Sequence, residues 1–266
     1  MVYNKTPLDI EKMRKACDLV SRVMGEVARH VAPGVSTRRL DDIAREFIVS
    51  HGGRPACLGY GGFPATLCLE PNDVVVHGFP SDYPLREGDI LGVDTVVELD
   101  GYHGDMCYTF AIGEVAPETL RLLRTTKESL WKGIAACRAG NRIGDIGHAI
   151  QTYVEERGYT VVREMCGHGI GLKMHEKPDV ANYGRKGRGE LIRPGMCLAI
   201  EPMINLGRRQ VVIERDGWTC RTRDGKPSAH YEHTVAVHEH ETEILTTFAY
   251  IEENLGPQAI TTPLDH

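Results

Sequence analysis

The chain repeats itself, and this duplication constrains its fold more than any other feature of the sequence. Four pairs of residues agree in type at one offset of 106: Leu40 with Ile146, Phe47 with Tyr153, Ile48 with Val154, and Gly52 with Gly158. The segment 86–94 also matches 193–201 at an offset of 107, and each of these segments ends in an acid. Self-similarity at one period predicts two copies of one structural unit.

Each copy begins with two helical segments and continues with strand-like sequence. Apolar residues recur at helical spacing through 10–27, and a second helix should start at Ser36 or Thr37 and end near His51. The second copy has matching helices at about 118–138 and 145–157. We therefore predict an α+β fold in which two pseudo-twofold halves place helix pairs over an antiparallel sheet.

The two halves should form one unit, because no linker rich in proline, glycine and serine separates them. We expect a single catalytic domain over 1–266, with pseudo-halves of about 8–112 and 117–245. A cleft between the halves is the natural place for a site.

Composition excludes several classes of protein. The net charge of −6 argues against a nucleic-acid partner. No stretch approaches the roughly 20 apolar residues of a membrane span, and the N-terminal sequence has no secretory apolar core. We expect a cytoplasmic monomer. The eight cysteines include no C-x-x-C pair, which predicts reduced and mostly buried thiols.

Acidic residues mark a predicted hairpin in the first half. Strand-forming sequence flanks Asp100-Gly101, a strong two-residue turn signal. The turn pairs Val96 with Asp105 and places Asp94 and Asp105 diagonally on one face, about 7–8 Å apart at the backbone. Two such carboxylates repel each other unless a cation lies between them. For this hairpin alone, two solvated surface acids are an equally good interpretation.

The second half supplies further acids and a histidine. Glu201 occupies the position equivalent to Asp94 inside an apolar run, and Glu232 lies in another strand-like run. The twofold would bring four carboxylates together, which requires more than one divalent ion. His168 lies among three glycines that allow close backbone approach. Mostly oxygen ligands with one imidazole suit Mn, Fe or Co better than a structural zinc.

These residues resemble the type I methionine aminopeptidases, the metallopeptidases with the pita-bread fold. The resemblance runs from about Lys5 to Leu245 and is carried by four motifs: Gly-His168-Gly-Ile-Gly, His175-Glu-Lys-Pro, Glu201-Pro-Met and Tyr-Glu232-His-Thr. It implies an enzyme that removes the initiator methionine from nascent proteins, with ribosome association as a further expectation.

The resemblance also implies a dinuclear metal centre containing Co, Mn, Fe or Zn. It assigns Asp94 to the first metal, Asp105 and Glu232 to bridging positions, and His168 and Glu201 to the second metal. Glu201 would also act as general base. His77 would lie near the substrate amine, and His175 would contact the peptide carbonyl. A monovalent cation would bind the carbonyl groups of Asn72, Val74 and Ser228.

The same resemblance implies a pocket for the methionine side chain, lined by Cys57, Tyr60, Phe63, Cys68 and Trp218. Three positions depart from the usual family pattern. Met174 precedes His175 where bacterial members usually carry Phe, Gly61 replaces a frequent His, and Gly92 replaces a usual Asn. These departures bear on the shape of the pocket, which His77, Met174 and His175 also border.

Two other functions remain open at this point. The proline-directed relatives, aminopeptidase P and prolidase, share the five metal ligands, but they usually carry an additional N-terminal domain for which this chain has no room. A binding protein on the same fold without catalytic activity would typically have lost ligands, and all five are present here.

Overall fold

The computed structural model of the chain describes residues 2–265. Its helices are α1 (Pro7–Ala28), α2 (Thr37–Ser50), α3 (Pro117–Ala136), α4 (Ile143–Glu155) and α5 (Ala249–Leu255), with 3₁₀ turns η1 (Tyr60–Gly62) and η2 (Gly256–Gln258). Its strands are β1 (Arg54–Pro55), β2 (Cys68–Pro71), β3 (Val74–Val76), β4 (Ile90–Leu99), β5 (Tyr102–Ala111), β6 (Thr160–Val161), β7 (Gly167–Gly169), β8 (Glu176–Val180), β9 (Cys197–Ile200), β10 (Met203–Asn205), β11 (Val211–Ile213), β12 (Cys220–Thr222), β13 (Ser228–His230), β14 (Glu232–Val237) and β15 (Thr242–Ile244).

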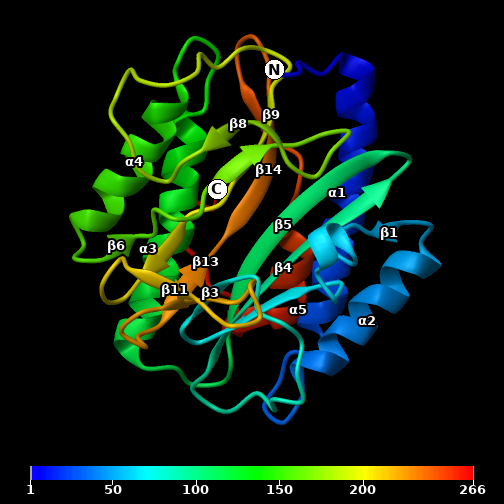
Figure 1. Cartoon of the computed structure of the whole chain (residues 1–266), viewed down its shortest axis with the longest axis vertical. Coiled ribbons are helices and arrows are strands. Elements are labelled where there is room, and N and C mark those ends of the chain that lie inside the picture. The colour runs from blue at the N-terminus through cyan, green and yellow to red at the C-terminus, as the bar shows by residue number, and fades with distance from the viewer. Residues whose placement is uncertain (1, 266) are drawn as a thin grey trace.

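A nine-stranded antiparallel sheet organises the molecule. Its strand order is β1-β4-β5-β14-β9-β7-β8, with β2 beside β4 and β15 beside β14. Strands β5 and β14 meet in the middle, so β4–β5 of the first half and β14–β9 of the second half lie on either side. Helices α1 and α2 flank the β4–β5 side, and α3 and α4 flank the β9–β14 side (Figure 1). This arrangement confirms the predicted fold.

The first pair of helices forms in the predicted segments, and α2 begins at the predicted cap. Thr6 and Asp9 form a capping box at the start of α1, and Ser36 caps α2 by accepting the N–H of Arg39. The pair Pro33-Gly34 predicts the end of the first helix, and α1 ends before it, at Ala28. Both helices bury one apolar stripe against the sheet, which is where most of their stability arises.

The β4–β5 hairpin has the predicted register. Leu99 pairs with Tyr102, and Val96 pairs with Asp105. Asp100 and Gly101 both have positive φ angles, 52° and 82°, as a type I′ turn requires. Because a slip of one residue would turn every side chain to the other face, this turn determines which way the acids of both strands point.

Two features of the fold differ from the sequence-based expectation. Strand-rich sequence was expected to the end of the chain, but α5 forms there and packs on α1, where Gly25 leaves room for Tyr250. The run around Glu201 is also not one strand, since β9 ends at Ile200 and β10 starts at Met203. Pro202 lacks an N–H group and so cannot continue the ladder.

Two composition-based expectations can be compared with the described chain. All eight cysteines are free thiols, and seven of them are buried, as predicted; Cys166 is the exposed one. Among residues 2–265, no helix combines the length and apolarity required to cross a bilayer.

Candidate metal centre and active site

The thirteen residues singled out from the sequence all line one cavity of about 460 Å³. They are Cys57, Tyr60, Phe63, Cys68, His77, Asp94, Asp105, His168, Met174, His175, Glu201, Trp218 and Glu232. The volume of this cavity falls in the range of about 300–1,000 Å³ that is common for small-molecule sites. The cavity brings together residues from both halves of the chain, as the predicted cleft requires.

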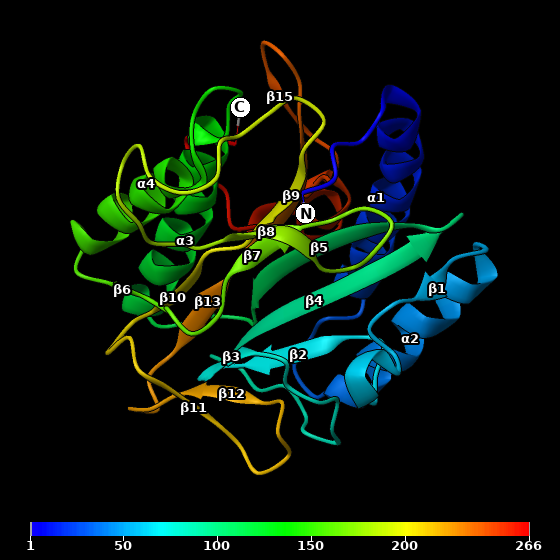
Figure 2. The same cartoon turned by 45° about the horizontal axis from the view of Figure 1, so that its top comes forward.

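The central strands position three of the four acids. Asp94 lies within β4, Asp105 lies within β5, and Glu232 is the first residue of β14. Glu232 pairs with Cys107 across the boundary between the halves, so it lies next to the strand that carries Asp105. Strands β5 and β14, labelled side by side in Figure 1, thus bring together residues that are more than a hundred positions apart in the sequence. Figure 2 shows the β4–β5 hairpin of the same sheet.

Glu201 lies at the break between β9 and β10. The side-chain amide of Asn182 donates to the carbonyl oxygen of Glu201 at 2.9 Å, which anchors the backbone where the ladder stops. The break turns the side chain of Glu201 toward the cavity, where one oxygen lies 3.6 Å from His168 Nε2.

The position of His168 depends on the close approach of its strand to a neighbouring strand, which a glycine allows. Strand β7 lies between β8 and β9, and a Cβ atom on Gly167 would come within 2.3 Å of the carbonyl oxygen of Ala199. The Nδ1–H group of His168 donates to the carbonyl oxygen of Gly169 at 3.0 Å. Nε2 is therefore left with its lone pair, and it also lies 3.6 Å from an Asp105 oxygen. This is the arrangement of a metal-ligating imidazole whose second nitrogen is anchored.

Electrostatics show that the acids are crowded together. Burial, with the charge of Glu70, raises the pKa of Asp94 to about 7. Burial also raises the pKa of Asp105, Glu201 and Glu232 well above the usual range, with further contributions from neighbouring carboxylates. Burial lowers the pKa of His168 to about 3, so its imidazole is neutral near pH 7. Such a cluster keeps its negative charge only with cations present.

The residues present fit a metal. Ligand atoms of Asp105, His168 and Glu232 lie within 4.8 Å of one another. One carboxylate oxygen of Asp105 and one of Glu232 are buried without a hydrogen-bond partner in the described chain. Buried charged oxygens of this kind are costly unless they are paired or bind a metal. The geometry therefore supports divalent metal binding.

Two further histidines border the cavity. Burial, with the nearby imidazoles of His230 and His175, lowers the pKa of His77 to about 4. The backbone of His77 has a φ of 60°, a strained conformation for a residue with a Cβ atom. The Nδ1 atom of His175 lies 2.8 Å from the hydroxyl group of Tyr60, which orients the ring.

An apolar cluster forms the other wall of the cavity. Met174 is buried there against Cys57, Phe63, Cys68 and Val96, with Phe79 and Trp218 packed at the margin. Gly61 is one of the departures from the family pattern, and a Cβ atom on it would lie 3.2 Å from the ring of Trp218. A side chain at position 61 would therefore press on this wall, so the departure at position 61 changes its shape.

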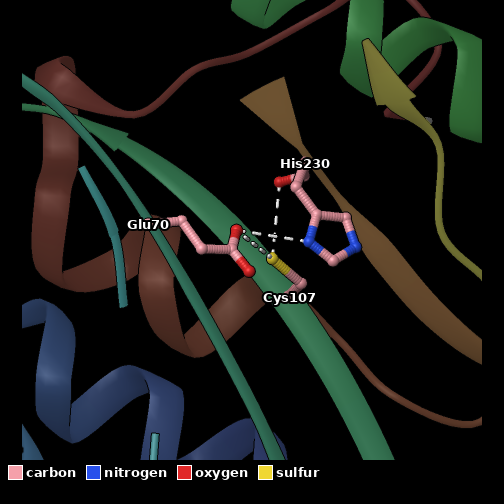
Figure 3. Close-up of side chains that lie close together, drawn as sticks. All are labelled: Glu70, Cys107 and His230. Atoms are coloured by element: carbon pink, nitrogen blue, oxygen red, sulfur yellow. Dashed lines mark hydrogen bonds and ion pairs between the residues drawn. The ribbon is translucent and has the colours of Figure 1, made fainter. Parts of the chain in front are cut away.

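The structure also places residues near the site that sequence reasoning did not single out. Glu70, Cys107 and His230 form a buried cluster beside Asp94 and Glu201 (Figure 3). Lys5 reaches from the N-terminal segment to Glu176 at 2.6 Å, next to His175. These contacts depend on which strands become neighbours, so no local pattern indicates them.

The carbonyl groups assigned to a monovalent cation come from adjacent segments. The N–H of Ser228 donates to the carbonyl oxygen of Asn72 at 2.9 Å. Val74, two residues after Asn72 in the chain, is the first residue of β3. Cation binding at this point stays a prediction.

Comparison with known proteins identifies the family. Residues 11–239 match the model of metallopeptidase family M24. A methionine aminopeptidase of Clostridium perfringens is 48% identical over 92% of this chain and 99% of its own length. Methionine aminopeptidase 1 of Bacillus subtilis is 44% identical, with the same coverage of both chains.

Solved structures agree with this result. A methionine aminopeptidase from Rickettsia prowazekii superposes with a TM-score of 0.92 at 44% identity, covering 93% of this chain and 100% of that one. A prolidase from Pyrococcus horikoshii shares the fold with a TM-score of 0.75, but at 18% identity, and the match spans 92% of this chain and 63% of the prolidase. The chain therefore belongs to metallopeptidase family M24, and within it to the methionine aminopeptidases.

Proposed function

We propose that this enzyme removes the N-terminal methionine from nascent polypeptides by metal-assisted hydrolysis of the first peptide bond. One observation carries the proposal: a single cavity has five ligand-type side chains on one wall and an apolar cluster around Met174 on the other. The first wall suits the reaction, and the second suits an unbranched apolar side chain.

Two divalent ions, of Co, Mn, Fe or Zn, would be held by Asp94, Asp105, His168, Glu201 and Glu232, with Asp105 and Glu232 shared between them. When bound, such ions lower the pKa of water and polarise the scissile carbonyl group. Asp105 and Glu232 come from paired strands, which suits ligands shared between neighbouring ions. A monovalent cation near Asn72, Val74 and Ser228 is a further part of the proposal.

The protein groups move the proton and orient the substrate. Glu201 takes a proton from the attacking water and returns it to the leaving amine, since its carboxylate borders the cavity beside His168. His175 donates to the carbonyl oxygen as negative charge develops there, with its ring held by Tyr60. His77 lies against the substrate amine and the scissile amide.

Specificity for the first residue follows from the shape of the cavity. The side chain of methionine packs against Phe63, Met174 and Trp218, which belong to the apolar wall. A free amine held beside His77 restricts cleavage to the first residue. Both pseudo-halves, 8–112 and 117–245, contribute to this one catalytic domain.

We further propose that the enzyme works as a monomer in the cytoplasm, on chains at the ribosome or just released from it. The net charge of −6 gives no support for direct binding to RNA. Sedimentation of the purified protein tests its oligomeric state.

A peptide assay tests the substrate class. We expect the metal-loaded enzyme to release methionine from Met-Ala-Ser and to leave peptides with Ala-Pro at the N-terminus intact. Preferential cleavage of the Ala-Pro peptide would instead assign the chain to the proline-directed enzymes that share its fold.

A further inference from the structure

Three ligand-type side chains form a second cluster that the proposed reaction does not use. Glu70 comes from β2, Cys107 from β5 and His230 from β13, and none of the three is more than 3% exposed. Figure 3 shows the carboxylate, the thiol and the imidazole pointing toward one another. Three different donor types that converge from three strands in a buried place are unusual outside a functional site.

The distances within this cluster are close to those of a metal site. Glu70 Oε2 lies 3.3 Å from His230 Nδ1 and 4.0 Å from Cys107 Sγ. All three donor atoms lie within 4.8 Å of one another. Zinc ligands at about 2.0–2.3 Å from the metal are roughly 3.3–3.8 Å apart in a tetrahedron. Small rotations of the side chains would therefore close the cluster around one ion.

Atoms of the cluster lack hydrogen-bond partners, and a glycine leaves the space that the cluster occupies. Oε1 of Glu70 is buried without a hydrogen-bond partner among the described residues. The same holds for Nε2 of His230, which is directed at Glu201 and not into the cluster. A Cβ atom on Gly92 would come within 2.3 Å of Glu70 Oε2. Position 92 is where the family usually carries Asn, so the glycine of this chain provides the space that Glu70 occupies.

We propose that Glu70, Cys107 and His230 bind one further divalent cation of the zinc type, separate from the five-ligand centre. One sulfur, one nitrogen and one oxygen donor favour zinc, whereas the oxygen-rich centre suits Mn, Fe or Co. On binding, the S–H bond of Cys107 breaks, its electron pair goes to the metal, and the proton leaves to solvent. One thiolate and one carboxylate then balance the two positive charges in a buried place.

The location of this ion links it to the main centre. Nδ1 of His230 faces Glu70, while Nε2 lies 3.9 Å from an oxygen of Glu201. A metal on the Nδ1 side would fix the ring and keep its other nitrogen directed at Glu201. The ion would therefore order the surroundings of a catalytic carboxylate without contacting the substrate.

Sulfur provides a test that does not depend on activity, because the five ligands of the main centre contain none. The full-length protein is saturated with zinc, freed of excess metal, and studied by elemental analysis and X-ray absorption at the zinc edge. We expect a zinc–sulfur distance of about 2.3 Å in the wild type. Cys107→Ser should lose this distance together with one equivalent of zinc per chain.

Two controls identify the thiol. Cys68 is also buried and contacts Asp94, and Cys166 is the exposed thiol beside the cavity. Cys68→Ser and Cys166→Ser should therefore keep the sulfur signal. A variant with Asp105→Asn and His168→Ala, impaired in the main centre, should still bind zinc through sulfur. That result would stand even if the proposed reaction were wrong.

Two results would overturn the proposal. One is the absence of zinc–sulfur scattering from zinc-saturated wild type, a measurement that needs no variant. The other is a signal that survives Cys107→Ser and vanishes in Cys68→Ser or Cys166→Ser. If Cys107→Ser does not fold, Glu70→Gln replaces it and should likewise lower the zinc content by one equivalent; an unchanged content would contradict the assignment.

Discussion

Thr234 and Asp105 exchange two hydrogen bonds across the boundary between the pseudo-halves. The hydroxyl oxygen of Thr234 accepts the backbone N–H of Asp105 at 3.2 Å, and the hydroxyl donates to the carbonyl oxygen of Asp105 at 2.9 Å. The ladder between β5 and β14 includes Glu232 and His233 but not Thr234, so this side chain extends the pairing beyond the ladder. It thereby fixes Asp105 relative to Glu232.

We predict that Thr234→Val lowers metal affinity by about 10–100-fold, the usual effect of removing a group that orients a ligand. The substitution keeps the shape of the side chain and removes only the hydroxyl group. Thr126→Val is the matched control, since Thr126 is also buried and donates to a backbone carbonyl within α3, away from the cavity. Calorimetric titration with Mn or Co measures both variants. Equal affinities would show that the Thr234 contact does not position the centre.

Asp105→Asn should reduce turnover by orders of magnitude while the protein stays folded, because a shared ligand would be weakened at both ions. Asp42→Asn, at an exposed position of α2, serves as the control. Asp216 is a poor control, because its carboxylate accepts the N–H group of Trp218 and so supports the apolar wall. Similar turnover rates for Asp105→Asn and Asp42→Asn would show that Asp105 is a structural residue of the hairpin and not an essential metal ligand.

His77→Ala and His175→Ala should keep the metal content of the wild type and lose turnover, because we assign both side chains to the substrate. Metal analysis and single-turnover kinetics separate the two effects. If one of these variants loses metal, the histidine that it lacks is a metal ligand and not a substrate contact. His175→Ala also removes the contact with Tyr60, so Tyr60→Phe is a useful companion that leaves the imidazole in place.

Met174 should make the pocket more permissive than one with Phe at that position. The methionine side chain is flexible and re-packs around substrate side chains of different shape. A misfit of one methylene group in an apolar pocket changes the discrimination between two substrates by only about 1–3 kcal/mol. We predict measurable cleavage of norleucine and some leucine at the first position, and tighter selectivity in Met174→Phe. The measurement is the ratio of kcat/KM for Met- and Leu-peptides in both forms. An unchanged ratio would exclude Met174 as a determinant of specificity.

Local signals were sufficient to predict much of this fold. The Asp100-Gly101 turn and the alternation around it predicted the β4–β5 register, and Ser36 predicted the start of α2. The internal repeat predicted that Glu201 would face Asp94 from the other half. Helix α5 was missed because its seven residues have no side-chain cap and form against α1, so tertiary packing decides their structure.

The Glu70, Cys107 and His230 cluster could not be predicted in this way. Each of its residues lies on a different strand, and none lies in a motif with metal-ligand spacing. The pairing of β2 with β4 and of β4 with β5 brings Glu70 to Cys107. His230 of β13 is added by backbone contacts with the hydroxyl group of Thr109 on β5. Sequence resemblance identified Gly92 as a departure, but its partner Glu70 became apparent only in three dimensions.

The most direct test of the account is the release of free methionine from Met-Ala-Ser by chelator-treated, metal-free protein, before and after addition of Mn, Fe, Co or Zn. We expect no release without metal and recovery when a divalent ion is restored, because the buried carboxylates around Asp105 serve the reaction only by holding such ions. Full activity of the metal-free protein would contradict it.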